Sequence, residues 1–326
     1  MMDSVKRSGL LGDVGGTNIR LAWQEHPDAP IERIRVFPCA EFPGIEQAIN
    51  SYLQLEGLPS PHQCAIGIAN PVTGDLIRMT NHSWCFSQAQ LKQHLGVQRL
   101  IVINDFTALA LALPFLSSDT LVQVGGGSVV PNSAMGLIGP GTGLGVSGLI
   151  YSDLNAQWVP ISGEGGHITL AAQTDEEFSV LRLIHRRYGH VSAERVLSGP
   201  GLVDLYLALR EYRGVGGKEI NGAAEITALA LQEGNELALQ TLQLFVGFLG
   251  SVAGDLALTL GARGGIYIGG GVVPRLIGWI ENSALRERFE SKGRFRSYLK
   301  EIPLWIINAP ASPALTGVSK ALRVGA

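Results

Sequence analysis

Hydrophobic positions follow two different periods along the chain. Residues 10–13 form a short apolar run that ends in a glycine turn, and Ile19, Leu21 and Trp23 occupy alternate positions after it. Alternation with a period of two indicates a half-buried strand, so this stretch predicts a β-hairpin. Similar runs predict strands at residues 31–37, 64–69, 76–79 and 100–103. Apolar residues at helical spacing predict helices over residues 45–53, between the caps Ser87 and Gly96, and over residues 106–113.

The second half of the chain opens with the same arrangement. Residues 135–138 are apolar, residues 139–143 form a glycine turn, and residues 144–151 have the pattern of a strand. Helical patterns then span residues 176–187, 202–212, 225–231 and 237–260, followed by strands at 265–268 and 304–307 and a last helix from Ala314. We therefore expect a duplicated α/β fold with helical insertions in the second copy, arranged as two domains around a cleft.

The composition narrows the class of protein. Hydrophobic residues make up 46% of the 326 and charged residues 16%, and 25 basic against 28 acidic residues give a net charge of −3. These values exclude intrinsic disorder and argue against a nucleic-acid surface. Cys39, Cys64 and Cys85 form no CxxC pair, so we expect neither a disulfide framework nor structural zinc, and we expect a cytoplasmic protein. The apolar stretch 242–260 contains Asp255, which favours a buried helix over a membrane span.

Two glycine turns lie between predicted strands, at residues 13–18 and 139–145. Successive backbone N–H groups in such turns converge and can bind phosphate oxygens, and Thr17 and Thr142 add hydroxyl donors. A tight hairpin without a ligand is the alternative for either turn alone, but two turns that each contain a threonine favour phosphate binding. A third cluster, residues 269–271, follows a strand and would let adenine approach the backbone, unless it is a plain turn.

Other nucleotide motifs are absent from the sequence or occur in the wrong context. Residues 143–148 match GxGxxG, but the residues that follow have the pattern of a strand, whereas the dinucleotide fingerprint must open a helix. No GxxxxGK[ST] segment occurs, and the protein-kinase motifs are missing.

Five polar side chains are candidates for chemistry on an alcohol. Asp105 ends a predicted strand, where a carboxylate can accept the proton of a substrate hydroxyl or can simply cap the next helix. Asn104 offers an amide beside it or braces a turn. Glu164 and His167 lie three residues apart among glycines, which suits a polyol better than a metal because no second histidine or cysteine is near. Glu194 lies near a helix start after Ser192 and either binds a ligand or interacts with the helix dipole.

Seven segments in the same order resemble the bacterial glucokinase family of the hexokinase-like group, in the actin-like ATPase superfamily. They are GDVGGTN at 12–18, MTNHSW at 79–84, INDFTA at 103–108, GTGLG at 141–145, GEGGH at 163–167, HVSAERVLSGPG at 190–201 and GGGVVPR at 269–275. The resemblance implies a small α/β domain at residues 1–110 plus 309–326 and a larger α+β domain at residues 111–308, which close on each other.

The resemblance also implies roles for individual residues. Asp105 would be the catalytic base, and Asn104, Glu164, His167 and Glu194 would bind the sugar hydroxyls. Three groups of residues would bind ATP: Gly12, Asp13, Val14, Gly15, Gly16, Thr17 and Asn18; Gly141, Thr142 and Gly143; and Gly269, Gly270 and Gly271. Asp13 would also contact Mg²⁺ through water.

The implied activity is phosphorylation of glucose at its 6-hydroxyl by ATP and Mg²⁺, in a homodimer without nucleic-acid or membrane partners. The zinc motif of a neighbouring group of sugar kinases is absent, because no cysteine follows His167. A kinase for mannose or fructose is an alternative. A non-catalytic ATP switch is disfavoured by Glu164, His167 and Glu194, and a sugar-responsive regulator by the absence of a DNA-binding segment.

Overall fold

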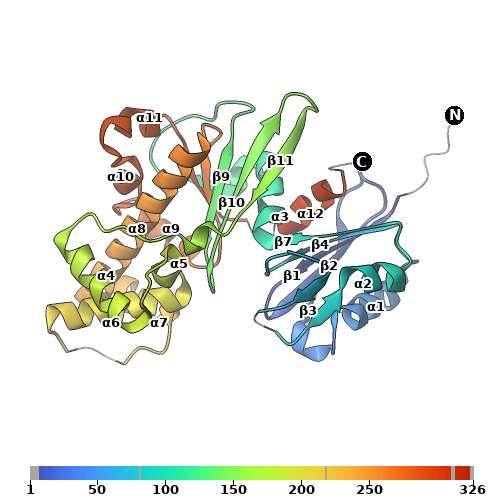
Figure 1. The fold of residues 1–326 in the computed structure, drawn as a ribbon, viewed down its shortest axis with the longest axis horizontal. Coiled ribbons are helices and arrows are strands. Elements are labelled where there is room, and N and C mark those ends of the chain that lie inside the picture. Colours follow the sequence, from blue (N-terminus) through green and yellow to red (C-terminus); the bar gives the residue numbers. More distant parts are fainter. Residues whose placement is uncertain (1–6, 81, 217–218, 310–312, 324–326) are drawn as a thin grey trace. The chain divides into compact units, whose positions relative to one another are not determined.

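The computed structural model describes residues 7–80, 82–216, 219–309 and 313–323 (Figure 1). The chain forms two compact units, one of Met1–Leu116, Ser152–Ser162 and Ala309–Ala326, the other of Ser117–Tyr151 and Gly163–Asn308. The expected boundary at residue 110 differs from this division, because residues 111–116 and Ser152–Ser162 belong to the first unit. Strand β11 (Gln157–Ser162) packs on helix α3 (Asp105–Ala112), where Thr107 Oγ1 and Ser162 Oγ lie 3.1 Å apart.

A five-stranded sheet forms the centre of the first unit, in the order β3-β2-β1-β4-β7. Its strands are β1 (Gly9–Val14), β2 (Asn18–Gln24), β3 (Glu32–Pro38), β4 (Gln63–Ile68) and β7 (Arg99–Asn104). The predicted hairpin is β1–β2, which is antiparallel, whereas β1, β4 and β7 run parallel. A small antiparallel ribbon adds β5 (Leu76–Arg78) and β6 (Cys85–Ser87).

Helices cover both faces of this sheet (Figure 1). Helices α1 (Ile45–Glu56) and α2 (Gln88–Leu95) pack on one face with Leu10, and α3 and α12 (Ala314–Ala321) pack on the other with Leu11. Neighbouring residues of a strand point to opposite faces, so the continuous apolar run of β1 contributes side chains to a separate core on each face of the sheet. Ser87 caps α2 by accepting from the Gln90 N–H, and Gly96 ends it in a left-handed conformation, as predicted.

The second unit repeats the strand order of the first. Within a six-stranded sheet, the strands of this unit follow in the spatial order β10 (Leu144–Ser152), β9 (Met135–Pro140), β12 (Ile266–Ile268), β13 (Leu304–Ile307) and β8 (Leu121–Gln123). Strands β9 and β10 form the second antiparallel hairpin, and β9, β12 and β13 run parallel. The series β10-β9-β12-β13 thus matches β2-β1-β4-β7, in agreement with the predicted duplication.

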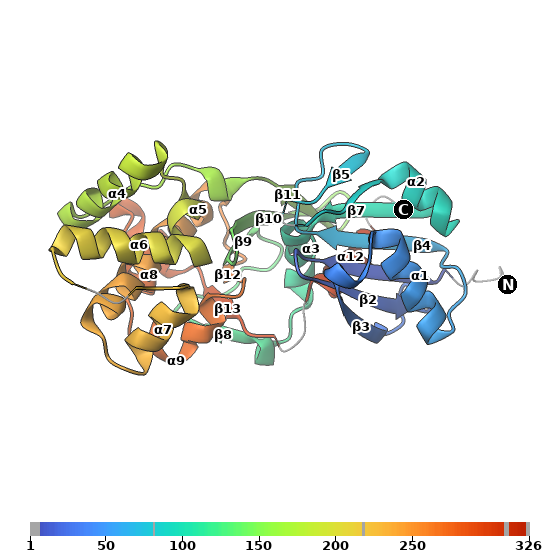
Figure 2. The same ribbon diagram turned by 90° about the horizontal axis from the view of Figure 1, so that it is seen from below.

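Most of the remaining helices lie in the second unit (Figure 2). They are α4 (Asp175–Tyr188), α5 (Ala193–Val196), α6 (Gly199–Arg213), α7 (Ala223–Leu231), α8 (Glu236–Leu260), α9 (Ile277–Ile280), α10 (Leu285–Glu290) and α11 (Arg296–Lys300). The 3₁₀ turns among the described residues are Cys39–Glu41, Leu113–Phe115, Ser118–Thr120, Gly165–His167, Val273–Leu276 and Gly293–Phe295. Helix α8 is long and apolar enough to cross a membrane, but 72% of its most apolar window is buried among the other helices, as the polar interruption at Asp255 predicted.

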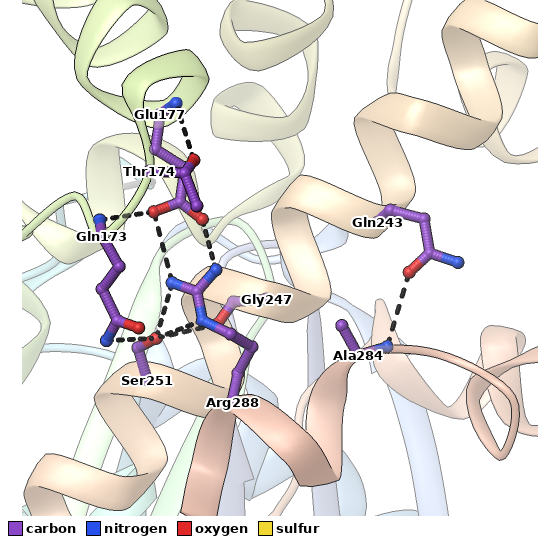
Figure 3. A network of polar contacts seen from close by, with 8 residues as sticks. All are labelled: Gln173, Thr174, Glu177, Gln243, Gly247, Ser251, Ala284 and Arg288. Atoms are coloured by element: carbon purple, nitrogen blue, oxygen red, sulfur yellow. Dashed lines mark hydrogen bonds and ion pairs between the residues drawn. The ribbon is translucent and has the colours of Figure 1, made fainter. Parts of the chain in front are cut away.

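A buried ion pair connects three of these helices (Figure 3). Arg288 on α10 contacts both carboxylate oxygens of Glu177 on α4, whose side chain is 1% exposed. Arg288 also donates to Ser251 Oγ on α8 at 3.0 Å, and the Gln173 N–H donates to Glu177 Oε2 at 2.6 Å. Each charged group therefore has several polar partners, which is the condition under which a buried ion pair is tolerated.

Candidate functional site

The parallel strands of the first unit end together at one edge of the sheet. The strand register aligns Val14 of β1 with Ile68 of β4, and Ile68 with Asn104 of β7. The turn after β1 and the start of α3 therefore share this edge. In open α/β sheets this carboxyl edge is where ligands bind.

Asn104 and Asp105 form the junction between β7 and α3. The N-cap is Asn104, whose Oδ1 accepts from the N–H groups of Phe106 at 2.9 Å and Thr107 at 3.2 Å. Asp105 is the first helical residue, so the alternative that it is itself the cap is wrong. The Asn104 amide donates to Asp105 Oδ1 at 3.0 Å, and the Phe106 N–H also donates to this oxygen at 2.9 Å. These bonds fix one carboxylate oxygen of Asp105.

The pKa of Asp105 is raised to about 6, mainly by burial and in smaller part by the negative charge of Asp13, while hydrogen bonds to the carboxylate lower it. Burial has this effect because it penalises the charged form of a carboxyl. A carboxylate with a pKa of about 6 is mostly ionised at pH 7 and yet basic enough to accept a proton from a developing alkoxide. Asp105 therefore has the acid–base property expected of a general base.

The hairpin β1–β2 provides the first glycine turn. Gly12, Asp13 and Val14 are the last residues of β1, Gly15, Gly16 and Thr17 form the turn, and Asn18 opens β2. Within it, the Gly15 N–H donates to the Asn18 carbonyl oxygen at 2.9 Å, and Thr17 is exposed. Asp13 is 7% exposed and accepts from Arg20 at 3.1 Å. This turn thus combines glycine backbone with an ion-paired carboxylate.

The hairpin β9–β10 provides the second glycine turn. The Gly141 N–H donates to the Gly143 carbonyl oxygen at 2.8 Å, which closes the turn around the exposed Thr142. The Gly199 N–H, at the start of α6, donates to the Gly141 carbonyl oxygen at 2.8 Å. The turn is therefore anchored to a helix start.

Glu194 lies directly against this second turn. Its Oε2 accepts from the Leu144 N–H at 2.8 Å, and its Oε1 lies 4.0 Å from Nε2 of His167. Ser192 caps the short helix α5 that presents Glu194, as predicted. A Cβ at Gly143 would lie 2.5 Å from Glu194 Oε2, so only glycine lets the carboxylate come this close.

Glu164 precedes a 3₁₀ turn in the same unit, and His167 is its last residue. The His167 N–H donates to the Glu164 carbonyl oxygen at 3.0 Å, and both residues are exposed. Gly166 between them packs against the Leu144 carbonyl oxygen. This contact brings the pair to the same end of β10 as Glu194.

The third glycine cluster lies beside the second turn. The Gly269 N–H donates to the Ile138 carbonyl oxygen at 2.8 Å, and the Val272 N–H donates to the Pro140 carbonyl oxygen at 3.2 Å. Gly270 has a φ of +81°, and a side chain there would collide with Pro140. Gly270 and Gly271 are exposed and Gly269 is buried behind them, so bare backbone lies next to the turn of Gly141, Thr142 and Gly143.

The structure also shows polar partners that we did not predict. Arg20 pairs with Asp13, and the signal was present, because the hairpin register places these two residues opposite each other. Asn70 lies two residues after the end of β4, and its Oδ1 accepts from the Thr80 hydroxyl at 2.7 Å. The Asn104 amide donates to the Asn70 carbonyl oxygen at 3.5 Å. Asn81, within the MTNHSW segment, lies outside the described residues.

Metal ligands do not gather in the part of the chain that the structure describes: no three His, Cys, Asp or Glu side chains there form a group that could hold an ion. Asp13 is the carboxylate of the first turn and suits Mg²⁺, which prefers oxygen ligands, retains most of its waters and commonly binds through one or two carboxylates and substrate phosphates.

Comparison with known proteins relates the chain to one family. Residues 10–324 match the family model described as Glucokinase. A glucokinase of Aromatoleum aromaticum is 50% identical over 314 residues, which are 96% of this chain and 94% of that protein. A bifunctional protein of Paraburkholderia xenovorans is 46% identical over 96% of this chain, and the chain spans about half (48%) of that relative.

A crystal structure of a glucokinase from an Antarctic psychrotroph is 36% identical, with a TM-score of 0.89, and the match covers 97% of this chain and 99% of that one. This likeness confirms the predicted α/β fold class with the actin-like ATPase architecture. It also agrees with the duplicated strand order described above.

Proposed function

Since the chain belongs to the glucokinase family, we propose that it transfers the γ-phosphoryl group of ATP to the 6-hydroxyl of glucose. The observation that best supports this proposal is Asp105, a carboxylate with a pKa of about 6 at the sheet edge that also holds the first glycine turn. Membership of the family supports the substrate class, and the geometry of Asp105 and of the first glycine turn supports the roles proposed for them.

Asp105 accepts the proton of the 6-hydroxyl while the oxygen attacks the γ-phosphorus. Asn104 and the Phe106 N–H hold Oδ1, so the carboxylate keeps one orientation. The bond between the γ-phosphorus and the β,γ-bridging oxygen breaks, and ADP leaves with that oxygen. Because the transition state of phosphoryl transfer is loose, most of the acceleration comes from positioning and charge stabilisation, and the base contributes roughly 10²–10⁴-fold.

Backbone N–H groups of the two glycine turns bind the phosphate oxygens. In the first turn these are the N–H groups of Gly16, Thr17 and Asn18, and in the second those of Thr142 and Gly143, whereas the N–H groups of Gly15 and Gly141 close the turns that shape each cradle. The adenine ring lies against Gly269, Gly270 and Gly271, where no side chain intervenes. When bound, Mg²⁺ would neutralise phosphate charge, and Asp13 would hold it through water.

Asn104, Glu164, His167 and Glu194 bind the sugar hydroxyls. A site whose polar groups lose a partner when one hydroxyl is inverted discriminates strongly against the wrong sugar. We further propose a cytoplasmic homodimer whose product, glucose 6-phosphate, enters glycolysis; both points are family expectations.

An assay of ADP release with ATP, Mg²⁺ and a panel of glucose, mannose and fructose tests this function. We expect glucose to give the highest kcat/KM and ATP hydrolysis without sugar to be slow. Asp105→Asn should lower kcat roughly 10²–10⁴-fold and change KM for glucose only mildly. Near-normal turnover in this variant would remove Asp105 as the base, and a preference for another hexose would replace the proposed substrate.

A further inference from the structure

Cys39 contacts the first glycine turn from the side of the core. It follows β3 and begins the 3₁₀ turn Cys39–Glu41, with its side chain fully buried. Its N–H donates to the Thr17 carbonyl oxygen at 2.8 Å, and its thiol donates to the Gly15 carbonyl oxygen at 3.6 Å. One residue therefore holds both ends of the segment Gly15-Gly16-Thr17.

The register of the hairpin gives Cys39 this position. Asn18 lies opposite Pro38, and proline has no N–H to donate. Cys39 is the next residue along, and its N–H continues the ladder by donating to the Thr17 carbonyl oxygen. The thiol then reaches past Thr17 to Gly15, a glycine whose backbone no side chain of its own restrains.

The two bonds determine where the turn's own donors point. In a planar trans peptide the carbonyl and the N–H of the next residue point in opposite directions. When Cys39 holds the Gly15 carbonyl toward the core, the N–H of Gly16 points away from it. The bond to the Thr17 carbonyl orients the N–H of Asn18 in the same manner. Both N–H groups belong to the segment proposed to bind phosphate.

We propose that Cys39 is a positioning residue for ATP, which keeps the N–H groups of Gly16 and Asn18 directed at the phosphates through its bonds to the preceding carbonyls. This inference rests on the proposed function of the turn. The backbone bond persists in any non-proline variant, so the thiol bond is the part that substitution can test.

Cys64 offers a matched control in the same core. It is equally buried on β4, but no acceptor for its thiol lies within hydrogen-bonding distance among the described residues. Cys39→Ala and Cys64→Ala each remove one buried sulfur, and only the first removes a bond to the turn. Cys39→Ser supplies a hydroxyl with an acceptor nearby, whereas Cys64→Ser buries a hydroxyl without one, which is costly.

We expect Cys39→Ala to raise KM for MgATP about two- to fivefold, the size appropriate to a weak S–H···O bond, with KM for glucose unchanged. Cys39→Ser should restore KM for MgATP. Cys64→Ala should lower the melting temperature to a similar degree and leave KM for MgATP at the wild-type value, and Cys64→Ser should be less stable than Cys64→Ala.

Equal KM values for MgATP in Cys39→Ala and Cys64→Ala would overturn the inference. A KM for MgATP in Cys39→Ser that stays as high as in Cys39→Ala would also overturn it. If the wild-type enzyme phosphorylates glucose, either of these results leaves the proposed function intact. A wild type without kinase activity would instead refute the function on which the inference rests.

Discussion

Asp105 is held in an environment that favours its neutral form. Its folded pKa of about 6 exceeds the value near 4 of an unfolded aspartate, so between these pH values the folded state binds more protons. The contribution of Asp105 to the free energy of unfolding is therefore present in full at low pH and is lost as the pH rises through about 6. The same shift supplies the basicity that the reaction needs, so activity is obtained at some cost in stability.

The raised pKa of Asp105 predicts how both activity and stability depend on pH. The kcat/KM for glucose should fall as the pH drops through about 6, because protonated Asp105 cannot accept a proton. Asp105→Asn should melt at a higher temperature than wild type at pH 7.5 and at nearly the same temperature at pH 4. Thermal melts at both pH values measure this, with the exposed Asp153→Asn as a control that should show no such difference. A less stable Asp105→Asn at pH 7.5 would contradict the assignment.

Glu194 connects the proposed sugar site to the second glycine turn. We expect Glu194→Ala to raise KM for glucose more than it changes nucleotide binding. Gly143→Ala should have a similar effect, about tenfold, because the new methyl group displaces the Glu194 carboxylate from the Leu144 N–H and a bond to a charged group is lost.

Gly141→Ala is the control, since a Cβ there meets no atom within 4 Å. Any effect of this change should fall on KM for ATP. Steady-state kinetics with each substrate varied in turn separates the two outcomes. An unchanged KM for glucose in both Glu194→Ala and Gly143→Ala would exclude Glu194 from the sugar site.

At the scale of elements, α4, α8 and α10 depend on one buried ion pair. Removal of a single partner leaves a charge buried without compensation, which costs roughly 3–5 kcal/mol. We therefore expect Glu177→Gln and Arg288→Met each to lower the free energy of unfolding of the second unit by about this amount. The double variant Glu177→Leu/Arg288→Met should be more stable than either single variant.

Urea titration followed by far-UV circular dichroism measures this difference. Glu211→Gln, which breaks the exposed pair with Arg187, is the control and should change stability by about 1 kcal/mol or less. If Glu177→Gln and Glu211→Gln lowered the free energy of unfolding equally, burial would not account for the importance of the Glu177–Arg288 pair.

Local elements could be predicted well because their signals are local. Both glycine hairpins, the caps Ser87 and Ser192 and the buried helix that ends at Leu260 follow from neighbouring residues. The pairing of Glu177 with Arg288 could not be predicted, because 111 residues separate them and each has the sequence context of an ordinary helix surface. Cys39 is a similar case, since no short pattern connects it to Gly15, 24 residues earlier.

At the scale of the whole molecule, the duplicated strand order places the two glycine hairpins at equivalent positions of two sheets. The repeated hairpin pattern indicated this from the sequence. The division of the chain was harder to foresee, because Ser152–Ser162 joins the first unit through its packing on α3, and no composition change marks its ends. The roles of the site residues stay predictions, which the variants above test.

The first unit is assembled from three separate stretches, and α12 belongs to the last of them. A ribosome that has translated residues 1–308 has not yet made the helix that packs on α3 and β1. Until then Leu11, Ala65 and Ala108 lack the helix that covers them, so the core on this face of the sheet can be completed only after Ala314–Ala321 has been synthesised.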